Sequence, residues 1–181
     1  MQSAQKFTVK GQIDKAIGEY QKLLKEDPND VRTILKIGDL FAKMGNNDTA
    51  IENYVTVAHH YASQGFYMKA IAIFKQIIKI NNSLIHINLE LGEMYQNLGL
   101  LTEAMGQYQL VANYYEEKGE VNKSLETLKK MANLDPLNVE SRITLAELYS
   151  RQGMTKEAID EFQSAATFLK KENRLEEYAK V

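Results

Sequence analysis

Single glycines at two alternating spacings are the feature that most constrains the fold. They stand at positions 11, 45, 65, 99, 119 and 153, so the differences between successive positions alternate between 34 and 20. A small residue follows five positions after each glycine, at Ala16, Ala50, Ala70, Ala104, Ser124 and Ala158. Equivalent positions therefore recur at a spacing of 54. Self-similarity at a fixed period of this length predicts a repeat array.

Between the glycines, apolar residues recur at steps of three and four, which indicates amphipathic helices. The pattern predicts helices over about 11–27, 31–44, 49–63, 84–98, 102–118, 121–134, 139–152 and 156–171, another after Gly65, and the start of one at Leu175. Asp30 is predicted to cap the helix from 31, and Asp48 or Thr49 the helix after Gly45. Asn173 stands where the next glycine is expected. No segment reads as a strand, so the chain is predicted to be all-α.

The helix over 31–44, the Gly45 turn and the start of the next helix resemble the tetratricopeptide repeat (TPR), a helix-turn-helix unit of about 34 residues. The family pattern of small and aromatic positions is matched by Gly38, Phe41, Gly45, Ala50 and Tyr54, then by Gly92, Tyr95, Gly99, Ala104 and Tyr108, and then by Ala146, Tyr149, Gly153, Ala158 and Phe162. The resemblance covers essentially the whole chain. It implies a right-handed α-solenoid of antiparallel helices.

The shorter of the two glycine spacings departs from the family pattern, because it has room for one helix and one turn only. We therefore expect one helix to be shared by two consecutive repeats, which gives three-helix modules that recur at the spacing of 54. A single array is predicted over 1–181, with modules of about 11–64, 65–118 and 119–172 and partial helices at both ends. The chain is expected to be a fragment of a longer protein.

Composition and motifs argue against nucleic-acid binding, a metal or cofactor site and an active site. The net charge is −2 and there is no cysteine, so no basic field favours nucleic acid and no thiolate site is available. His59 and His60 are adjacent on a predicted helix and diverge by about 100°, so surface histidines are favoured over a metal pair. No phosphate-binding or catalytic motif occurs. We expect no enzyme activity, no cofactor, no metal site, no membrane insertion and a cytoplasmic location.

In the TPR family, the groove is lined by the first helix of each repeat, and the resemblance carries that role to this chain. The partner-binding positions expected on this basis are Arg32, Leu35, Asp39 and Lys43, then His86, Leu89, Glu93, Gln96 and Asn97, and then Glu140, Ile143, Glu147 and Arg151. Each set mixes a branched apolar residue with charged and amide groups, which suits an extended peptide or a partner helix bearing basic and apolar groups. An alternative interpretation is that Asp39, Glu93 and Glu147 form a solvated acidic stripe that binds no partner. Leu35 and Asp39 replace the Lys and Asn with which one subgroup grips a terminal carboxylate, so chaperone-tail binding is disfavoured.

The sequence therefore predicts a non-enzymatic scaffold or adaptor that binds a protein or peptide. One alternative is a structural or assembly module that self-associates through the array ends or the long helices. Another is the non-catalytic arm of an enzyme or regulator. The sequences of the repeats also resemble those of repeat proteins from gliding and predatory bacteria. Some of those proteins are linked to cell polarity and a small Ras-like GTPase.

Overall fold

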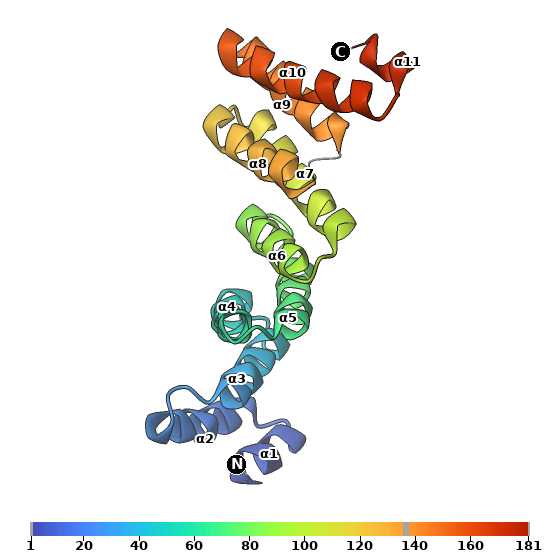
Figure 1. Ribbon diagram of the computed structural model, residues 1–181. Helices are drawn as coiled ribbons and strands as arrows, with labels where there is room; N and C mark the ends of the chain where they lie inside the picture. The colour runs from blue at the N-terminus through green and yellow to red at the C-terminus, as the bar shows by residue number, and fades with distance from the viewer. Residues whose placement is uncertain (1, 136–137, 181) are drawn as a thin grey trace. The chain divides into compact units, whose positions relative to one another are not determined.

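The computed structural model describes residues 2–135 and 138–180 (Figure 1). The chain divides into two compact units, unit 1 (Met1–Ile87) and unit 2 (Asn88–Val181). Over the described residues there are eleven helices and no strand, so the all-α prediction is confirmed.

The helix boundaries repeat with the period of the glycines. Unit 1 contains α1 (Gln2–Val9), α2 (Ile13–Glu26), α3 (Val31–Lys43), α4 (Asn47–Ser63) and α5 (Tyr67–Ile80), and α6 (Ile85–Asn97) begins in it. Unit 2 continues with α7 (Leu101–Glu117), α8 (Val121–Leu134), α9 (Val139–Arg151), α10 (Thr155–Lys171) and α11 (Leu175–Tyr178). The first residues of α3, α6 and α9 are 54 apart, and so are those of α4, α7 and α10. A single helix fills each of the shorter intervals, α4 between Gly45 and Gly65 and α7 between Gly99 and Gly119.

Within each unit, helices that follow one another along the chain pack together. In unit 1 the contacting pairs are α1 with α2, α2 with α3, α3 with α4 and α4 with α5. In unit 2 they are α7 with α8, α8 with α9, α9 with α10 and α10 with α11. Such packing buries each helix on its neighbours in sequence, which is the basis of stability in repeat arrays.

The six turn glycines adopt a left-handed backbone conformation. Gly45 has φ +77° and the other five turn glycines have φ between +69° and +75°, a backbone conformation that glycine adopts without steric cost. Asn173 takes the same role with φ +58°. After Gly45, the N–H of Asn46 donates to the carbonyl of Phe41 at 2.9 Å, the six-to-one bond of a Schellman motif. The same bond recurs after every one of these turns, to the carbonyls of Phe7, Tyr61, Tyr95, Tyr115, Tyr149 and Leu169.

The capping prediction is confirmed at α3 and wrong at α4. Asp30 accepts hydrogen bonds from the backbone N–H groups of Arg32 and Thr33. At α4 the cap is Asn46, which accepts from the N–H of Thr49, and not Asp48 or Thr49. The helix begins at Asn47 because the Gly45 turn already sets the direction of the chain, so α4 includes both of the residues that were expected to cap it.

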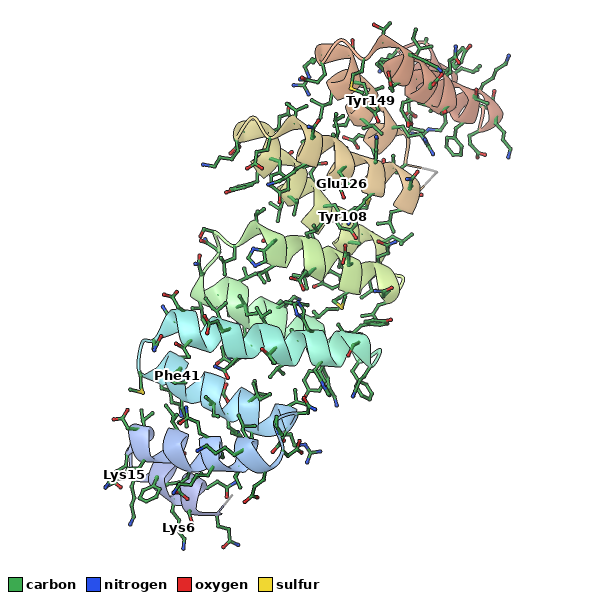
Figure 2. All side chains as sticks on the ribbon, turned by 90° about the vertical axis from the view of Figure 1, so that its left-hand side faces the viewer. Lys6, Lys15, Phe41, Tyr108, Glu126 and Tyr149 are labelled. Carbon is green, nitrogen blue, oxygen red and sulfur yellow. The ribbon has the colours of Figure 1, made fainter. Side chains whose placement is uncertain are left out.

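Small residues and tyrosines form the core. Ala50 and Ala104 are fully buried, and so is Tyr108, while Tyr54 is 1% exposed. Gly38 and Gly92 occupy the small position of the first helices, and the Tyr54 and Tyr108 rings lie against them. Figure 2 labels Tyr108 among the helices of unit 2. The Tyr rings can approach this closely only because the facing residue has no side chain.

Candidate partner-binding surface

The predicted partner-binding residues lie on α3, α6 and α9, and all are at least partly accessible. Arg32, Lys43, His86, Gln96, Asn97, Glu140, Glu147 and Arg151 are exposed, and Leu35, Asp39, Leu89, Glu93 and Ile143 are half-buried. The α3 set and His86 belong to unit 1, and the remaining α6 residues and the α9 set belong to unit 2.

In unit 1, Asp39 is part of a hydrogen-bonded chain across three helices. The Tyr54 hydroxyl on α4 donates to Oδ1 of Asp39 on α3 at 3.0 Å. Nε2 of Gln76 on α5 donates to the same hydroxyl at 2.7 Å. Burial and, secondly, the charge of Asp39 raise the pKa of Tyr54 well above its usual value. Asp39 therefore holds the helices together as well as facing the surface.

In unit 2, the equivalent positions carry a different set of bonds. Nζ of Lys130 on α8 lies 2.9 Å from Oε1 of Glu93 on α6. The Tyr108 hydroxyl donates to Oε1 of Gln96 at 2.9 Å. Burial, followed by the charge of Glu93, raises the pKa of Tyr108 to about 12. Glu93 thus has an internal cation as its partner, in the place where Asp39 has a tyrosine hydroxyl.

The third acid of the series, Glu147 on α9, has a different environment. The residue equivalent to Tyr54 and Tyr108 is Phe162, which has no hydroxyl group to donate. Within the described residues Glu147 forms no hydrogen bond or ion pair, and it is exposed. Instead it lines a pocket of about 540 Å³ that extends along α9.

This α9 pocket has an apolar part and an acidic rim. Its walls are Asn138, Val139, Glu140, Ile143, Thr144 and Glu147 from α9 and its N-terminal cap, with Arg174 and Glu177 from the start of α11. Nε and Nη2 of Arg174 donate to Oε1 and Oε2 of Glu177, at 2.8 Å and 2.5 Å respectively, so the charge of Arg174 is already balanced. Glu140 and Glu147 remain as the net charge of the pocket, which therefore favours a cation beside an apolar group.

Of the residues predicted on α9, Glu140, Ile143 and Glu147 share this pocket, and Arg151 does not. Nη1 of Arg151 lies 2.6 Å from Oε1 of Glu116 on α7. It belongs to the contacts that join α7 to α9. Arg151 is also the basic residue in the last turn of α9, where a cation is favoured by the helix dipole.

The histidines contact different aromatic rings. His59 lies edge-on to Phe74, with 6.1 Å between ring centroids, and His60 lies edge-on to Tyr61 at 6.2 Å. No group of three or more potential metal ligands occurs among the described residues. None of the described helices combines the length and apolar character that crossing a bilayer requires.

A series of lysine–aromatic contacts was not anticipated from the sequence. Nζ of Lys15 lies 5.9 Å from the Phe7 centroid, Lys69 lies 5.2 Å from Tyr61, and Lys123 lies 5.1 Å from Tyr115. The pairs span the turns from α1 to α2, from α4 to α5 and from α7 to α8, and Lys15 is labelled in Figure 2. These contacts could have been predicted, because the lysine and the aromatic residue of each pair both recur at a spacing of 54.

The comparisons with known proteins give no family assignment. No family model matches the chain, and no curated protein matches it. Among solved structures, it is similar to a crystal structure of MamA, with 23% identity over 96% of this chain and 98% of that one and a TM-score of 0.32. It is also similar to the TPR-like repeats of a putative kinesin light chain from Podosopora anserina, with 18% identity, 96% and 94% coverage and a TM-score of 0.40. For YrrB, described as a TPR protein with an unusual peptide-binding site, these values are 13%, 91%, 82% and 0.33. Because all three TM-scores are below 0.5, the fold assignment rests on the helices of this chain.

Proposed function

We propose that this chain is a non-enzymatic scaffold, a three-helix variant of the TPR architecture, that binds a peptide or a partner helix on its first-helix faces. The observation that carries the proposal is the α9 pocket, in which three of the residues predicted for partner binding come together. We propose further contacts on the two other first helices. They are Arg32, Leu35, Asp39 and Lys43 on α3, and His86, Leu89, Glu93, Gln96 and Asn97 on α6.

The chemistry of the pocket indicates what kind of segment it binds. Ile143 offers a branched apolar side chain, and Glu140 and Glu147 offer carboxylates that no cation of this chain neutralises within the described residues. The internal pair of Lys130 and Glu93 is a precedent for a lysine reaching this acid position. A partner segment with a lysine or arginine close to an apolar side chain fits these groups.

The test is capture of partners from an extract of the source cells by immobilised protein. Glu140→Gln with Glu147→Gln removes the two charges from exposed positions, and Ile143→Glu places a charge on the apolar part. Ile159→Glu is the matched control, because Ile159 is 47% exposed on α10 in the same unit and outside the pocket. We expect both pocket variants to lose the captured protein and the control to keep it.

Thermal unfolding must accompany this experiment, because Ile143 also packs against the cluster of Val139, Ala165 and Leu169. If the double glutamine variant unfolds like the wild type and still captures every partner, the pocket is not the binding site. Loss of capture after Leu35→Glu and Leu89→Glu, with no effect of the α9 variants, would move the proposal to the α3 and α6 faces.

A further inference from the structure

Helix α5 differs in charge from the two helices at equivalent positions. It contains Lys69, Lys75 and Lys79 and no acidic residue, whereas α2 contains three acids and α8 contains Glu126. The acid-free stretch extends over 53–89 and includes all three histidines of the chain. Helix α5 therefore carries three lysines and no acid of its own to offset them, in a chain with 24 acidic residues.

One exposed stripe of α5 shows the difference most clearly. Met68, Ala72, Lys75 and Lys79 follow one another at helical steps of three and four, and all four are exposed. The same positions are Asp14, Gly18, Gln21 and Lys25 in α2, and Asn122, Glu126, Lys129 and Asn133 in α8. Both of those stripes combine one acid with one lysine. The α5 stripe carries two lysines and two apolar residues, Met68 and Ala72.

The turn before α5 extends the apolar end of the stripe. Phe66 is 49% exposed and Met68 is 63% exposed. At the position of Phe66, the other modules have Gln12, Glu120 and Arg174, which are all polar. Nζ of Lys69 lies 4.7 Å from the centroid of the Phe66 ring. This surface thus presents apolar side chains next to lysines, the reverse of the acidic rim and apolar part of the α9 pocket.

The two units have opposite net charges. Unit 1 contains 11 lysine and arginine residues and 8 acids, a net charge of +3. Unit 2 contains 11 lysine and arginine residues and 16 acids, a net charge of −5. The long-range field therefore favours an approach of unit 1 of one molecule to unit 2 of another.

We propose that the α5 stripe of one molecule docks into the α9 pocket of a second copy of this chain. Lys79 faces Glu147, and Met68 contacts Ile143, the accessible apolar side chain of the pocket. The inference rests on the proposed function, since it names a partner for the same pocket. Two different surfaces meet in this contact, so each molecule keeps one free surface of each kind. Such heterologous contacts build rings or open-ended series of molecules.

Analytical ultracentrifugation of the full chain tests the proposal. We expect oligomers that grow with concentration up to about 1 mM. They should dissociate when salt is raised from about 50 mM to about 500 mM, because exposed charges are screened at that ionic strength. A chain that stays monomeric over this concentration range at low salt overturns the proposal and leaves the binding of other peptides to the pocket intact.

Two neutral variants assign the surfaces. Met68→Asn with Lys79→Asn gives α5 the residues that α8 has at those positions, and Glu140→Gln with Glu147→Gln removes the pocket charges. Each should weaken self-association by about tenfold or more. Lys25→Asn and Glu126→Gln are the controls, because they remove an exposed charge from a stripe of α2 or α8, and they should associate like the wild type.

Mixing the two neutral double variants gives the sharpest readout. One has an intact pocket and the other an intact stripe, so an equimolar mixture should form a dimer that does not grow further. If either variant alone associates like the wild type, or if the mixture stays monomeric, the proposal is wrong.

Vesicles containing about 30% phosphatidylserine test whether the α5 stripe binds an anionic membrane surface instead of a second copy of the chain. Co-sedimentation with these vesicles that the α5 variant abolishes, in a chain that does not self-associate, would assign the stripe to a membrane surface and overturn the proposal. Absence of vesicle binding, together with the mixed dimer, supports it.

Discussion

Gly92 lies against the ring of Tyr108 so closely that an added Cβ would be 2.7 Å from Cε1 of that ring. At the equivalent position of unit 1, a Cβ on Gly38 would be 3.0 Å from Cε1 of Tyr54. Distances below 3.0 Å between such atoms require a shift, and here the obstacle is a fully buried aromatic ring. The small position of the first helix is thus fixed by the tyrosine of the second.

Replacing Gly92 by alanine should destabilise the chain despite the better helix propensity of alanine. Overpacking costs about 1–3 kcal/mol, against a propensity gain of about 1 kcal/mol. Gly106→Ala is the matched control, because Gly106 is also helical and has nothing within 4 Å of its added Cβ. Chemical denaturation should show Gly106→Ala more stable than the wild type by about 0.5–1 kcal/mol and Gly92→Ala less stable than Gly106→Ala by about 1–3 kcal/mol. Equal stabilities of the two variants would contradict the close approach.

Tyr108 should remain protonated in alkaline solution in which an unperturbed tyrosine ionises. Its pKa is raised from 10.0 to about 12, mainly by burial. A raised pKa means that the folded state holds the proton more tightly than the unfolded state. The stabilisation is complete below pH 10 and is lost as the pH rises towards 12. The difference in tyrosinate absorbance between the wild type and Tyr108→Phe should show this titration, and ionisation near pH 10 would contradict it.

Tyr54→Phe should cost more stability than Tyr108→Phe. The Tyr54 hydroxyl takes part in two hydrogen bonds, with Asp39 and Gln76, whereas the Tyr108 hydroxyl donates only to Gln96 among the described residues. Each bond contributes about 0.5–1.5 kcal/mol, and loss of the Tyr54 hydroxyl also leaves two half-buried groups without this partner. Urea denaturation of both variants measures the difference. In Tyr54→Phe with Gln76→Leu the effects of the two changes should be non-additive.

The Asp30 cap should make the stability of α3 depend on pH. The hydroxyl of Thr33 donates to Oδ2 at 2.5 Å, and this bond is the main reason why the pKa of Asp30 is lowered from 3.8. A lowered pKa gives stabilisation that is present above about pH 4 and is lost as the pH falls through the folded value. Asp30→Ala should therefore cost about 0.5–2 kcal/mol at neutral pH and less in acid.

Asn46→Ala is the control for that experiment, since Asn46 caps α4 without a titrating group. Its cost should stay the same across the acid range, measured by thermal unfolding in parallel with Asp30→Ala. A similar pH dependence for both variants would show that acid acts elsewhere in the chain.

The sequence predicted the helices well because the turns are specified locally. Gly45, Gly65 and their counterparts need the left-handed backbone, and each marks a helix end to within two residues. The spacing of 54 also predicted the turn at Asn173, where asparagine replaces the glycine of the other modules. Capping of α4 could not be predicted, because the Schellman turn after Gly45 starts the helix whether or not a capping side chain follows. Leu100 and Met154 occupy the place of Asn46 in the later modules and give no side-chain cap.

The candidate site was predicted less completely, since its residues depend on contacts between helices. Asp39, Glu93 and Glu147 look alike in sequence, but their partners are a tyrosine hydroxyl, a lysine and no described group, respectively. Gln76 and Lys130 stand at equivalent positions of two modules and could have indicated the first two partners. The pocket along α9, to which α11 and its cap contribute Glu177 and Arg174, could not be predicted. It depends on how the helices pack, and no local sequence pattern encodes that packing.

The recurrence of helix boundaries at a fixed interval has a consequence for the history of the gene. Because α3, α6 and α9 begin at equivalent points, misaligned recombination between two modules joins matching helices and keeps the reading frame. An array can gain or lose a whole module in one such event without disturbing any turn. The differences between modules, such as Gln76 against Lys130 or Met68 against Asn122, then mark positions where copies diverged after duplication, and that is where selection for distinct contacts should be sought.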